Sequence, residues 1–366
     1  MSDVTAAPAY PQLPYPVDVE LGALATLGAR VAAVAPAHRY ALVSDSIVAP
    51  LYAGQARASF APGARVELLT VPAGEAHKTR ESWARLTDEM LAAGFGRDTT
   101  VVALGGGVVG DLAGFVAATY MRGVAIVQVP TTLLAMIDAS VGGKTGVDTP
   151  AGKNLVGAFH QPAAVVIDPA LLATLPMPQL RSGLAEALKH GVIADERYFD
   201  AVVGDLPTLL GPSGATSGAM RRLIVRSVAI KAAVVASDER EQGLRKILNF
   251  GHTIGHAVEH ASGYTLLHGE AVAVGMALES ELAERLGLAA CGTHRQVRAA
   301  LEQAGLPASR PPSLHPDALL AATRGDKKAR GGVVEYALPR RIGAMAGERA
   351  GWVVPVSDGS VREVLA

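Results

Sequence analysis

The sequence contains a single cysteine, Cys291, among its 366 residues. One thiol cannot form an intramolecular disulfide, so the chain is not a small domain held together by disulfide bonds. The scarcity of cysteine fits a reducing compartment, and we expect a cytoplasmic protein.

Long apolar runs are also lacking. No segment reaches the roughly 18 uninterrupted apolar residues that a membrane-spanning helix needs. The first residues, MSDVTAAPAYPQLPYP, have neither the basic region nor the apolar run of a secretory signal. We therefore expect no contact with a membrane and no secretion.

The chain also has almost no net charge and few aromatic side chains. The formal net charge is −1, which removes any general electrostatic attraction to nucleic acid or anionic lipid. Small anions are not excluded, because a local group of lysines and arginines is enough to bind one. Hydrophobic residues make up 49% and aromatic residues 4%, so a large aliphatic core is expected. The length suits about two domains.

The first half of the chain alternates two kinds of segment. Five short apolar runs end in polar or glycine turns and predict strands, at residues 39–45, 65–72, 99–107, 124–132 and 164–169. Helical patterns lie between them, at 79–94 and 111–121. Continuous apolar strands that alternate with helices predict a mostly parallel sheet, covered on both faces.

The second half of the chain has little strand signal after residues 172–180. Long helical patterns follow instead, at 181–193, 220–239, 249–263 and 270–287. A boundary near Pro176 and Pro178 divides the chain into an α/β domain, residues 1–177, and a mostly α-helical domain, residues 178–366. One late hairpin is predicted at residues 333–345.

A glycine-rich loop follows the third predicted strand. In TTVVALGGGVVGDLAGF, Gly105, Gly107 and Gly110 have the G-x-G-x-x-G spacing, between a strand and a helix. Such glycines let the backbone approach a pyrophosphate at the N-terminus of a helix, which favours a nucleotide over a plain tight turn. The next strand ends in VPTT, without the acidic residue expected for the ribose, and Asp45 at the end of the first strand is the substitute.

A second segment resembles a phosphate-binding motif but lacks a residue that the motif requires. DASVGGKT, residues 138–145, resembles a Walker A loop, but Asp138 stands where the first glycine is needed. A carboxylate there repels phosphates, which argues against a P-loop NTPase.

Four of the ten histidines fall within residues 249–271: His252, His256, His260 and His268. His252 and His256 are four residues apart and share one helix face. His268 opens the next helical pattern, where a helix N-terminus favours its neutral, metal-binding form. Position 253 is threonine, which excludes the H-E-x-x-H site of the zincin proteases.

Two of these histidines and one carboxylate would make a catalytic zinc site with an open fourth position. In an otherwise apolar helix, Glu186 and Lys189 lie three residues apart on one face. Glu186 is therefore either the partner of Lys189 in a buried ion pair or a metal ligand. The simpler alternative for each histidine is a surface or satisfied core residue, and His260 is expected to be the solvated one.

Several cationic and amide side chains stand in separate segments, in some cases beside glycine: Lys144, Lys153, Asn154, Lys231, Arg245 and Lys328. A lysine beside glycine in a loop has little apolar surface to cover. If these side chains converged, they would hold a doubly anionic substrate. The run RGDKKARGG, residues 324–332, is by default only a charged loop.

With these residues in view, the chain resembles 3-dehydroquinate synthase, a sugar-phosphate cyclase of the shikimate pathway. The similarity extends from YALVSD to the DKK loop. Its densest blocks are GGGVVGDLAGFVAATYMRG, VPTTLLAMIDASVGGKTGVDTPAGKNLVGAFHQP, RSGLAEALKHG and LRKILNFGHTIGHAVE with LLHGEA. In AFHQP, His160 stands where the family has tyrosine, which we interpret as tolerated variation.

The resemblance implies an N-terminal Rossmann-like α/β domain, a helical C-terminal domain and a cleft between them. It implies a lyase of aromatic amino acid and chorismate biosynthesis that acts as a homodimer with NAD and one divalent metal, zinc or cobalt. The substrate would be 3-deoxy-D-arabino-heptulosonate 7-phosphate, and the products 3-dehydroquinate and phosphate. Transient oxidation, β-elimination of phosphate, re-reduction and an aldol-type closure would make up the reaction.

The resemblance also implies individual roles. The metal ligands would be Glu186, His252 and His268. The NAD contacts would be Asp45, Glu75, Lys78, Gly105, Gly106, Gly107, Asp111, Thr131, Thr132, Lys153 and Thr174. The catalytic residues would be Asp138, Lys144, Asn154, Lys189 and His256. The substrate contacts would be Lys231, Arg245, Asn249, Lys328 (or Lys327) and Arg122, the last supplied across the dimer interface.

Two rival functions have specific differences. Another cyclase of the superfamily would make an inosose, a valiolone or an aminated dehydroquinate. The inosose and valiolone relatives alter the GGKTG and LAEALKH blocks, which here keep the dehydroquinate pattern. The aminodehydroquinate synthase is not distinguished by these residues. A metal-dependent polyol dehydrogenase would consume NAD and would not need the phosphate-binding lysines or Arg122.

Overall fold

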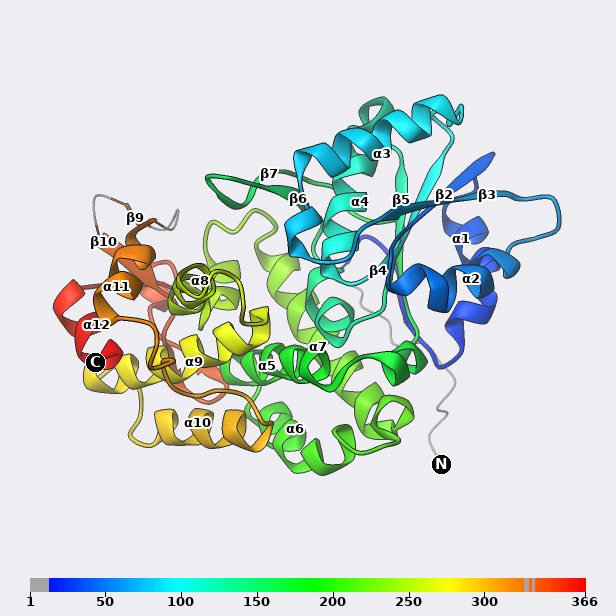
Figure 1. Cartoon of the computed structure of the whole chain (residues 1–366). Helices are drawn as coiled ribbons and strands as arrows, with labels where there is room; N and C mark the ends of the chain where they lie inside the picture. Colours follow the sequence, from blue (N-terminus) through cyan, green and yellow to red (C-terminus); the bar gives the residue numbers. More distant parts are fainter. Residues whose placement is uncertain (1–12, 326–328, 331–332) are drawn as a thin grey trace. The chain divides into compact units, whose positions relative to one another are not determined.

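The computed structural model of the protein describes residues 13–325, 329–330 and 333–366 (Figure 1). The chain forms two compact units. The first contains the described residues up to Leu175 together with Ala215–Ala232, and the second contains Pro176–Gly214 and Ala233–Ala366. This division differs from a single boundary after residue 177, because helix α7 (Gly218–Ser237) begins in the first unit and ends in the second.

A six-stranded parallel sheet forms the centre of the first unit, in the order β1-β8-β5-β4-β2-β3. The strands are β1 (Val17–Val19), β2 (Arg39–Asp45), β3 (Arg65–Val71), β4 (Thr100–Gly105), β5 (Ala125–Pro130) and β8 (Ala164–Ile167). The five strands predicted from the apolar runs are confirmed. β1 was not predicted, because three residues are too few to show a periodic pattern.

The strand order reverses beside β2. The chain passes from β2 to β3 on one side of β2 and then returns to form β4 on its other side. Asp45 ends β2 and Gly105 ends β4, and these strands are neighbours, with Ser44 opposite Leu104. Ligands of open parallel sheets bind at such a reversal, beside the carboxyl ends of the strands.

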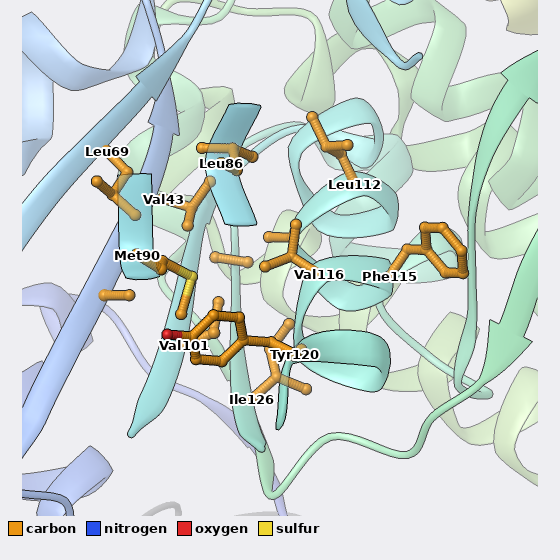
Figure 2. Close-up of a cluster of buried hydrophobic side chains, with 14 of the residues drawn as sticks. Val43, Leu69, Leu86, Met90, Val101, Leu112, Phe115, Val116, Tyr120 and Ile126 are labelled. Atoms are coloured by element: carbon orange, nitrogen blue, oxygen red, sulfur yellow. The ribbon is translucent and has the colours of Figure 1, made fainter. Parts of the chain in front are cut away.

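Helices α3 (Arg80–Ala92) and α4 (Gly107–Thr119) cover one face of this sheet (Figure 1). The side-chain oxygen of Thr79 accepts a hydrogen bond from Ser82 N, 3.2 Å away, and so caps the N-terminus of α3. Figure 2 shows the core between these helices and the strands, built from fully buried residues of α3, α4, β2, β4 and β5, including Leu86, Met90, Leu112, Val116, Val43, Val101 and Ile126. This core is mainly aliphatic, as the composition predicts.

Asp168, just after β8, connects separate segments of the first unit by hydrogen bonds. Its buried carboxylate accepts hydrogen bonds from Gly22 N at 2.9 Å, Leu24 N at 3.1 Å and Ala170 N at 3.0 Å. It thereby joins the end of the strand to η1 (Ala23–Thr26) and caps η6 (Pro169–Thr174).

An antiparallel hairpin of β6 (Lys144–Thr149) and β7 (Gly152–Phe159) lies beside α4. The prediction that the GGKTG and GKN segments are loops is wrong, since Lys144, Lys153 and Asn154 all lie in these strands. Glycine weakens the strand signal, yet here it permits close pairing: a Cβ on Gly157 would lie 2.1 Å from the Thr145 carbonyl oxygen.

The remaining elements of the first unit are short. They are α1 (Leu27–Val34), η2 (Ala49–Ala53), α2 (Gly54–Ala58), η3 (Glu75–His77), η4 (Tyr120–Arg122), η5 (Ala135–Ala139) and η7 (Gly214–Thr216), the last of which continues from the second unit.

The described part of the second unit is mostly helical, as predicted. Its helices are α5 (Met177–Ala194), α6 (Glu196–Leu209), η8 (Leu244–Asn249), α8 (His252–Ala261), α9 (His268–Arg285), α10 (Thr293–Gln303), α11 (Pro316–Gly325), η9 (Glu348–Ala350) and α12 (Asp358–Leu365). None of the helices in the described part of the chain is long and apolar enough to span a membrane.

The late hairpin is shorter than predicted. β11 (Pro339–Arg341) pairs with β12 (Ala344–Met345), whereas β10 (Val333–Tyr336) pairs with β9 (Ala329–Arg330) and β13 (Val354–Val356). The sequence pattern detects extended segments but does not identify their partners, so two small sheets were predicted as one hairpin.

Candidate active site

Three side chains of the second unit converge on one point. Glu186 lies within α5, whereas His252 and His268 are the first residues of α8 and α9. The Nε2 atoms of both histidines lie 3.5 Å from the same oxygen, Oε1 of Glu186. One ligand atom from each residue falls within 4.8 Å of the others, which suits a three-ligand metal site with an open position.

The other ring nitrogen of each histidine also has a partner. Nδ1 of His252 lies 3.1 Å from the carbonyl oxygen of Phe250, to which it can donate a hydrogen bond. Nδ1 of His268 lies 3.5 Å from a carboxylate oxygen of the buried Glu259. In the neutral ring of His252 the contact with Phe250 keeps the proton on Nδ1 and leaves Nε2 available to a metal. Sequence reasoning missed Glu259, although it follows His256 by three residues on the same helix.

The charges around the two histidines shift their pKa values in opposite directions. Burial and the nearby Lys189 cation lower the pKa of His252 well below 6.5, so its ring is neutral. Burial also lowers the pKa of His268, but hydrogen bonds and charges from Glu186 and Glu259 outweigh it and raise this pKa to about 9. His268 therefore holds a proton that a metal would have to displace.

Glu186 uses its two oxygens differently. Oε1 faces the two histidines, whereas Oε2 forms an ion pair with Nζ of Lys189. Both side chains are fully buried. The sequence left open whether Glu186 is an ion-pair partner or a candidate ligand, and the geometry allows both at once.

The other two histidines of the window differ in exposure. His256 is partly buried, and its ring centre lies 5.4 Å from that of His252. His256 belongs to a second group with Glu259 and His268, and not to the group that contains Glu186. His260 is exposed, as the sequence analysis expected, and its ring lies against Tyr264.

Glycines bring the helices that carry the ligands together. A Cβ on Gly269, the second residue of α9, would lie 2.1 Å from the Ser182 carbonyl oxygen of α5. The hydroxyl oxygen of Ser182, one turn before Glu186, accepts a hydrogen bond from Gly269 N at 2.9 Å. The absence of a side chain on Gly269 thus allows α5 to contact the start of α9 beside His268.

Helix η8 and the loop before it in the second unit present two further candidate residues, Arg245 and Asn249. The carboxylate of Asp238 accepts hydrogen bonds from the backbone N atoms of residues 242, 243 and 245, which fixes the loop. Buried Arg245 donates to the Glu239 carbonyl at 2.5 Å, and Asn249 donates to Glu241 at 2.6 Å. Asp238 and Glu241 were not predicted, because acidic residues in a charged loop have no distinguishing pattern.

In the first unit, the glycine loop connects β4 directly to α4. A Cβ on Gly106 would lie 3.1 Å from Thr132, and one on Gly110 would lie 2.9 Å from the Gln128 side-chain oxygen. Among the described side chains none caps the N-terminus of α4, and the buried Thr131 hydroxyl has no hydrogen-bond partner there. Helix N–H groups without a side-chain cap and an unsatisfied hydroxyl suit a nucleotide's phosphates.

Lys78 connects several of the predicted NAD residues. Its Nζ lies 2.9 Å from Glu75, 3.3 Å from Asp111 and 3.7 Å from Asp148, and Lys153 lies 3.7 Å from Glu75. Burial raises the pKa of Asp111 to about 6, although the Lys78 cation acts against this shift. Asp148, which the sequence did not single out, completes the group from β6.

The other predicted NAD residues lie at the ends of elements. Asp45 accepts hydrogen bonds from Ile47 N and Val48 N, both at 2.8 Å, and Thr132 accepts one from Ala135 N at 3.1 Å. The hydroxyl of Thr174 lies 2.7 Å from that of Tyr52, a residue that no motif indicated.

Asp138 and Lys231 form an ion pair within the first unit. Nζ of Lys231 lies 2.5 Å from the Asp138 carboxylate and donates to the Asp138 carbonyl at 2.6 Å. Lys144 is exposed and opens strand β6, where a P-loop would continue as a helix, which supports the rejection of that motif. Asn154 is exposed, has a φ of 53°, and donates its backbone N–H to Asp148.

Two substrate candidates remain. Arg122 is exposed and, with Met121, adopts left-handed backbone angles, φ 70° and 49°. Consecutive non-glycine residues in this region are strained and often mark functional positions. Lys328 and its alternative Lys327 lie outside the described residues.

Comparison with known proteins identifies the family. The 3-dehydroquinate synthase N-terminal model matches residues 68–182, and the C-terminal model matches residues 183–329. The chain belongs to the 3-dehydroquinate synthase family. As a member of this family it is an enzyme of the phosphate-eliminating lyase class.

Individual relatives agree with this assignment. A 3-dehydroquinate synthase of Symbiobacterium thermophilum is 49% identical over 332 residues, which cover 90% of this chain and 92% of the relative. Among solved structures, 2-epi-5-epi-valiolone synthase from Streptomyces hygroscopicus subsp. jinggangensis, with NAD⁺ and Zn²⁺ bound, has a TM-score of 0.86 and 33% identity, covering 99% and 98% of the two chains.

A second solved structure has the same architecture. It is 2-deoxy-scyllo-inosose synthase with carbaglucose-6-phosphate, NAD⁺ and Co²⁺, at a TM-score of 0.86 and 28% identity over 95% of each chain. These two cyclases with other products are less similar in sequence than the 3-dehydroquinate synthase of Symbiobacterium thermophilum.

Proposed function

We propose that this enzyme converts 3-deoxy-D-arabino-heptulosonate 7-phosphate to 3-dehydroquinate and inorganic phosphate. The observation that carries the proposal is the convergence of Glu186, His252 and His268, in a chain whose two halves both match 3-dehydroquinate synthase models. Oxidation to a ketone, elimination of phosphate, re-reduction and ring closure make up the proposed reaction.

A divalent metal, zinc or cobalt, would be held by Glu186, His252 and His268. The fit rests on two Nε2 atoms that face one carboxylate oxygen, with Nδ1 of each ring engaged elsewhere. When bound, the metal supplies Lewis acidity toward the substrate's hydroxyl and carbonyl oxygens. The contact of His252 Nδ1 with the Phe250 carbonyl and the ion pair of Glu186 with Lys189 keep the donor atoms oriented.

NAD would be held in the first unit. Gly105 to Gly107 and the start of α4 would take the pyrophosphate, while Asp45 at the neighbouring strand end would take the ribose. We assign further contacts to Glu75, Lys78, Asp111, Thr131, Thr132, Lys153 and Thr174. When bound, NAD⁺ supplies a hydride acceptor that is regenerated within one turnover.

The remaining side chains would bind and orient the substrate. In the second unit these are Lys189, Arg245, Asn249 and His256, and in the first they are Asp138, Lys144, Asn154 and Lys231, with Lys328 outside the described residues. His256 is the candidate for proton transfer near the histidine pair. The substrate's own phosphate would take the proton in the elimination, so a separate carboxylate base is not required.

We also propose a cytoplasmic homodimer in which Arg122 reaches the substrate phosphate bound by the partner. The first unit exposes apolar side chains near Arg122: Met121 is next to it, and Phe159 precedes His160, whose ring contacts the Val124 carbonyl. Burial of these exposed apolar side chains against a second subunit would favour association.

The deciding assay uses the heptulosonate phosphate with a catalytic amount of NAD⁺. Phosphate release without accumulation of NADH supports the cyclase. Accumulation of NADH, or no phosphate release by the metal-loaded dimer, contradicts the proposal, and the former supports the polyol dehydrogenase. An aminated substrate supplied in parallel tests the aminodehydroquinate synthase.

A further inference from the structure

A buried carboxylate outside the candidate ligand set contacts the start of α8. Glu279 lies in α9 and is fully buried. Its Oε2 accepts a hydrogen bond from Gly251 N at 2.6 Å, and its Oε1 accepts one from Ile254 N at 3.0 Å. The two oxygens thus bind the backbone immediately before His252 and two residues after it.

This contact supplies what the helix lacks at its own start. α8 begins at His252 after Gly251, which has a φ of 79°, and among the described residues no local side chain caps it. The first N–H groups of a helix need acceptors, and the positive end of the helix dipole favours a negative charge. Glu279 therefore acts as an N-cap that comes from the neighbouring helix.

Glycines make this reach possible. A Cβ on Gly275 would lie 1.9 Å from the Gly251 carbonyl oxygen, and a Cβ on Gly251 would lie 2.4 Å from Met276. The turn before His252 and α9 are consequently in backbone contact one turn before Glu279. Because α9 also begins with His268, one helix both carries one imidazole and holds the backbone of the other.

We propose that Glu279 is a positioning residue for the metal centre, which fixes His252 relative to His268. The inference rests on the proposed function, in that it takes Glu186, His252 and His268 to bind a metal. Substitution of residues that orient metal ligands typically weakens metal affinity roughly tenfold to a hundredfold.

The test compares Co²⁺ affinity and the visible absorption of bound Co²⁺ in the wild-type protein and three variants. Glu279→Gln keeps the shape but turns an N–H donor toward one of the two backbone N–H groups. Glu281→Gln is the control on the same helix, because Glu281 pairs at the surface with Arg285. Asp168→Ala is the control for lost stability, because Asp168 caps backbone N–H groups in the first unit.

We expect Glu279→Gln to bind Co²⁺ at least tenfold more weakly, with an altered spectrum, at a temperature where circular dichroism shows it folded. Both controls should keep wild-type affinity, even though Asp168→Ala melts at a lower temperature. If Glu279→Gln does not fold, Glu279→Asp, which keeps the charge but is one methylene shorter, replaces it with the same expectation.

The outcomes separate the two proposals. Wild-type protein that binds no Co²⁺ overturns the metal centre itself. If the wild-type and Glu279-substituted proteins differ less than tenfold in Co²⁺ affinity, only the role of Glu279 is overturned. An equal loss of affinity in Asp168→Ala also overturns it, because general destabilisation would then explain the effect.

Discussion

At the scale of single residues, the candidate metal centre depends on how each donor atom is oriented. Glu186 gives one oxygen to Lys189 and the other to the histidine pair. Each imidazole has its Nδ1 beside an oxygen atom and its Nε2 toward Glu186. The buried carboxylate of Glu186 and the buried imidazole of His252 are costly to desolvate unless they are paired in this way.

Glu186→Gln and His268→Ala should each abolish bound metal and turnover while the protein stays folded. Either change removes one of three ligands, and a two-ligand site holds zinc weakly. Metal content by mass spectrometry, circular dichroism and the phosphate assay measure the three quantities. Full activity in a chelator-treated variant without metal would refute the metal's part in the reaction.

Metal binding by chelator-stripped protein should release about one proton at pH 7.5. The pKa of His268 is about 9, above its ordinary 6.5, so protonated His268 stabilises the fold below pH 6.5 and this contribution is lost as the pH rises through 9. The metal must displace that proton, whereas the pKa of His252 lies well below 6.5 and its ring contributes none.

Calorimetric titrations with Zn²⁺ in buffers of different ionisation enthalpy count this proton. The apparent affinity should rise with pH up to about pH 9 and then level off, as the His268 pKa requires. A pH-independent affinity between pH 6.5 and 9 would contradict the assigned proton.

At the scale of secondary-structure elements, side chains from distant segments complete the helix and strand ends. Ser182 of α5 accepts from the second residue of α9, and Glu279 of α9 accepts from the start of α8. After β8, the Asp168 carboxylate likewise accepts hydrogen bonds from the distant Gly22 N and Leu24 N. At the start of α9, Glu270 is also a local acceptor, for Leu267 N at 2.8 Å. The distant acceptors are not visible as motifs in the sequence, because they come from other elements.

Asp168→Ala should lower the free energy of unfolding by about 2–4 kcal/mol, because it leaves buried N–H groups without an acceptor. Urea denaturation of the two proteins measures the difference. Asp18→Ala is the control, since Asp18 forms a partly exposed pair with Arg30 and its loss should cost less than about 1 kcal/mol. Equal effects of the two substitutions would show that the Asp168 network contributes little.

At the scale of the whole molecule, the proposed homodimer concerns the strained turn at Met121 and Arg122. Met121 is also an exposed apolar residue. If Arg122 binds the phosphate held by the partner, then Arg122→Ala should raise KM for the heptulosonate phosphate at least tenfold, with the dimer intact. Analytical ultracentrifugation with steady-state kinetics measures both. Arg57→Ala, at an exposed position of α2, is a control.

Mixing provides a sharper test of the same idea. A subunit that lacks Arg122 and one that carries Glu186→Gln should regain activity when they form mixed dimers, because one site then has both residues. Absence of any recovery after subunit exchange would place Arg122 in its own subunit's site or outside the site altogether.

The strand and helix pattern of the chain follows from local sequence. Apolar runs predicted five of the strands in the parallel sheet, and glycine at 263 with Tyr264 correctly predicted the end of α8. The start of α9 at His268 was likewise predicted. These features depend on side-chain periodicity and turn residues within a few positions, which a sequence states directly.

The prediction that the lysine–glycine segments are loops was wrong for a physical reason. Glycine lowers intrinsic strand propensity, and only the pairing of β6 with β7 reveals why the small residues are needed. Likewise, nothing local shows that residues 215–232 belong with the first unit or that β10 pairs with β13.

The residue types of the candidate site could be named before any coordinates, because the family resemblance fixes identity position by position. The proton positions on the imidazoles, the double use of Glu186 and the cap from Glu279 could not. Glu186 lies in α5, whereas the two histidines that it faces open α8 and α9, and the cap joins Glu279 to Ile254, 25 positions away. Only packing brings such atoms together.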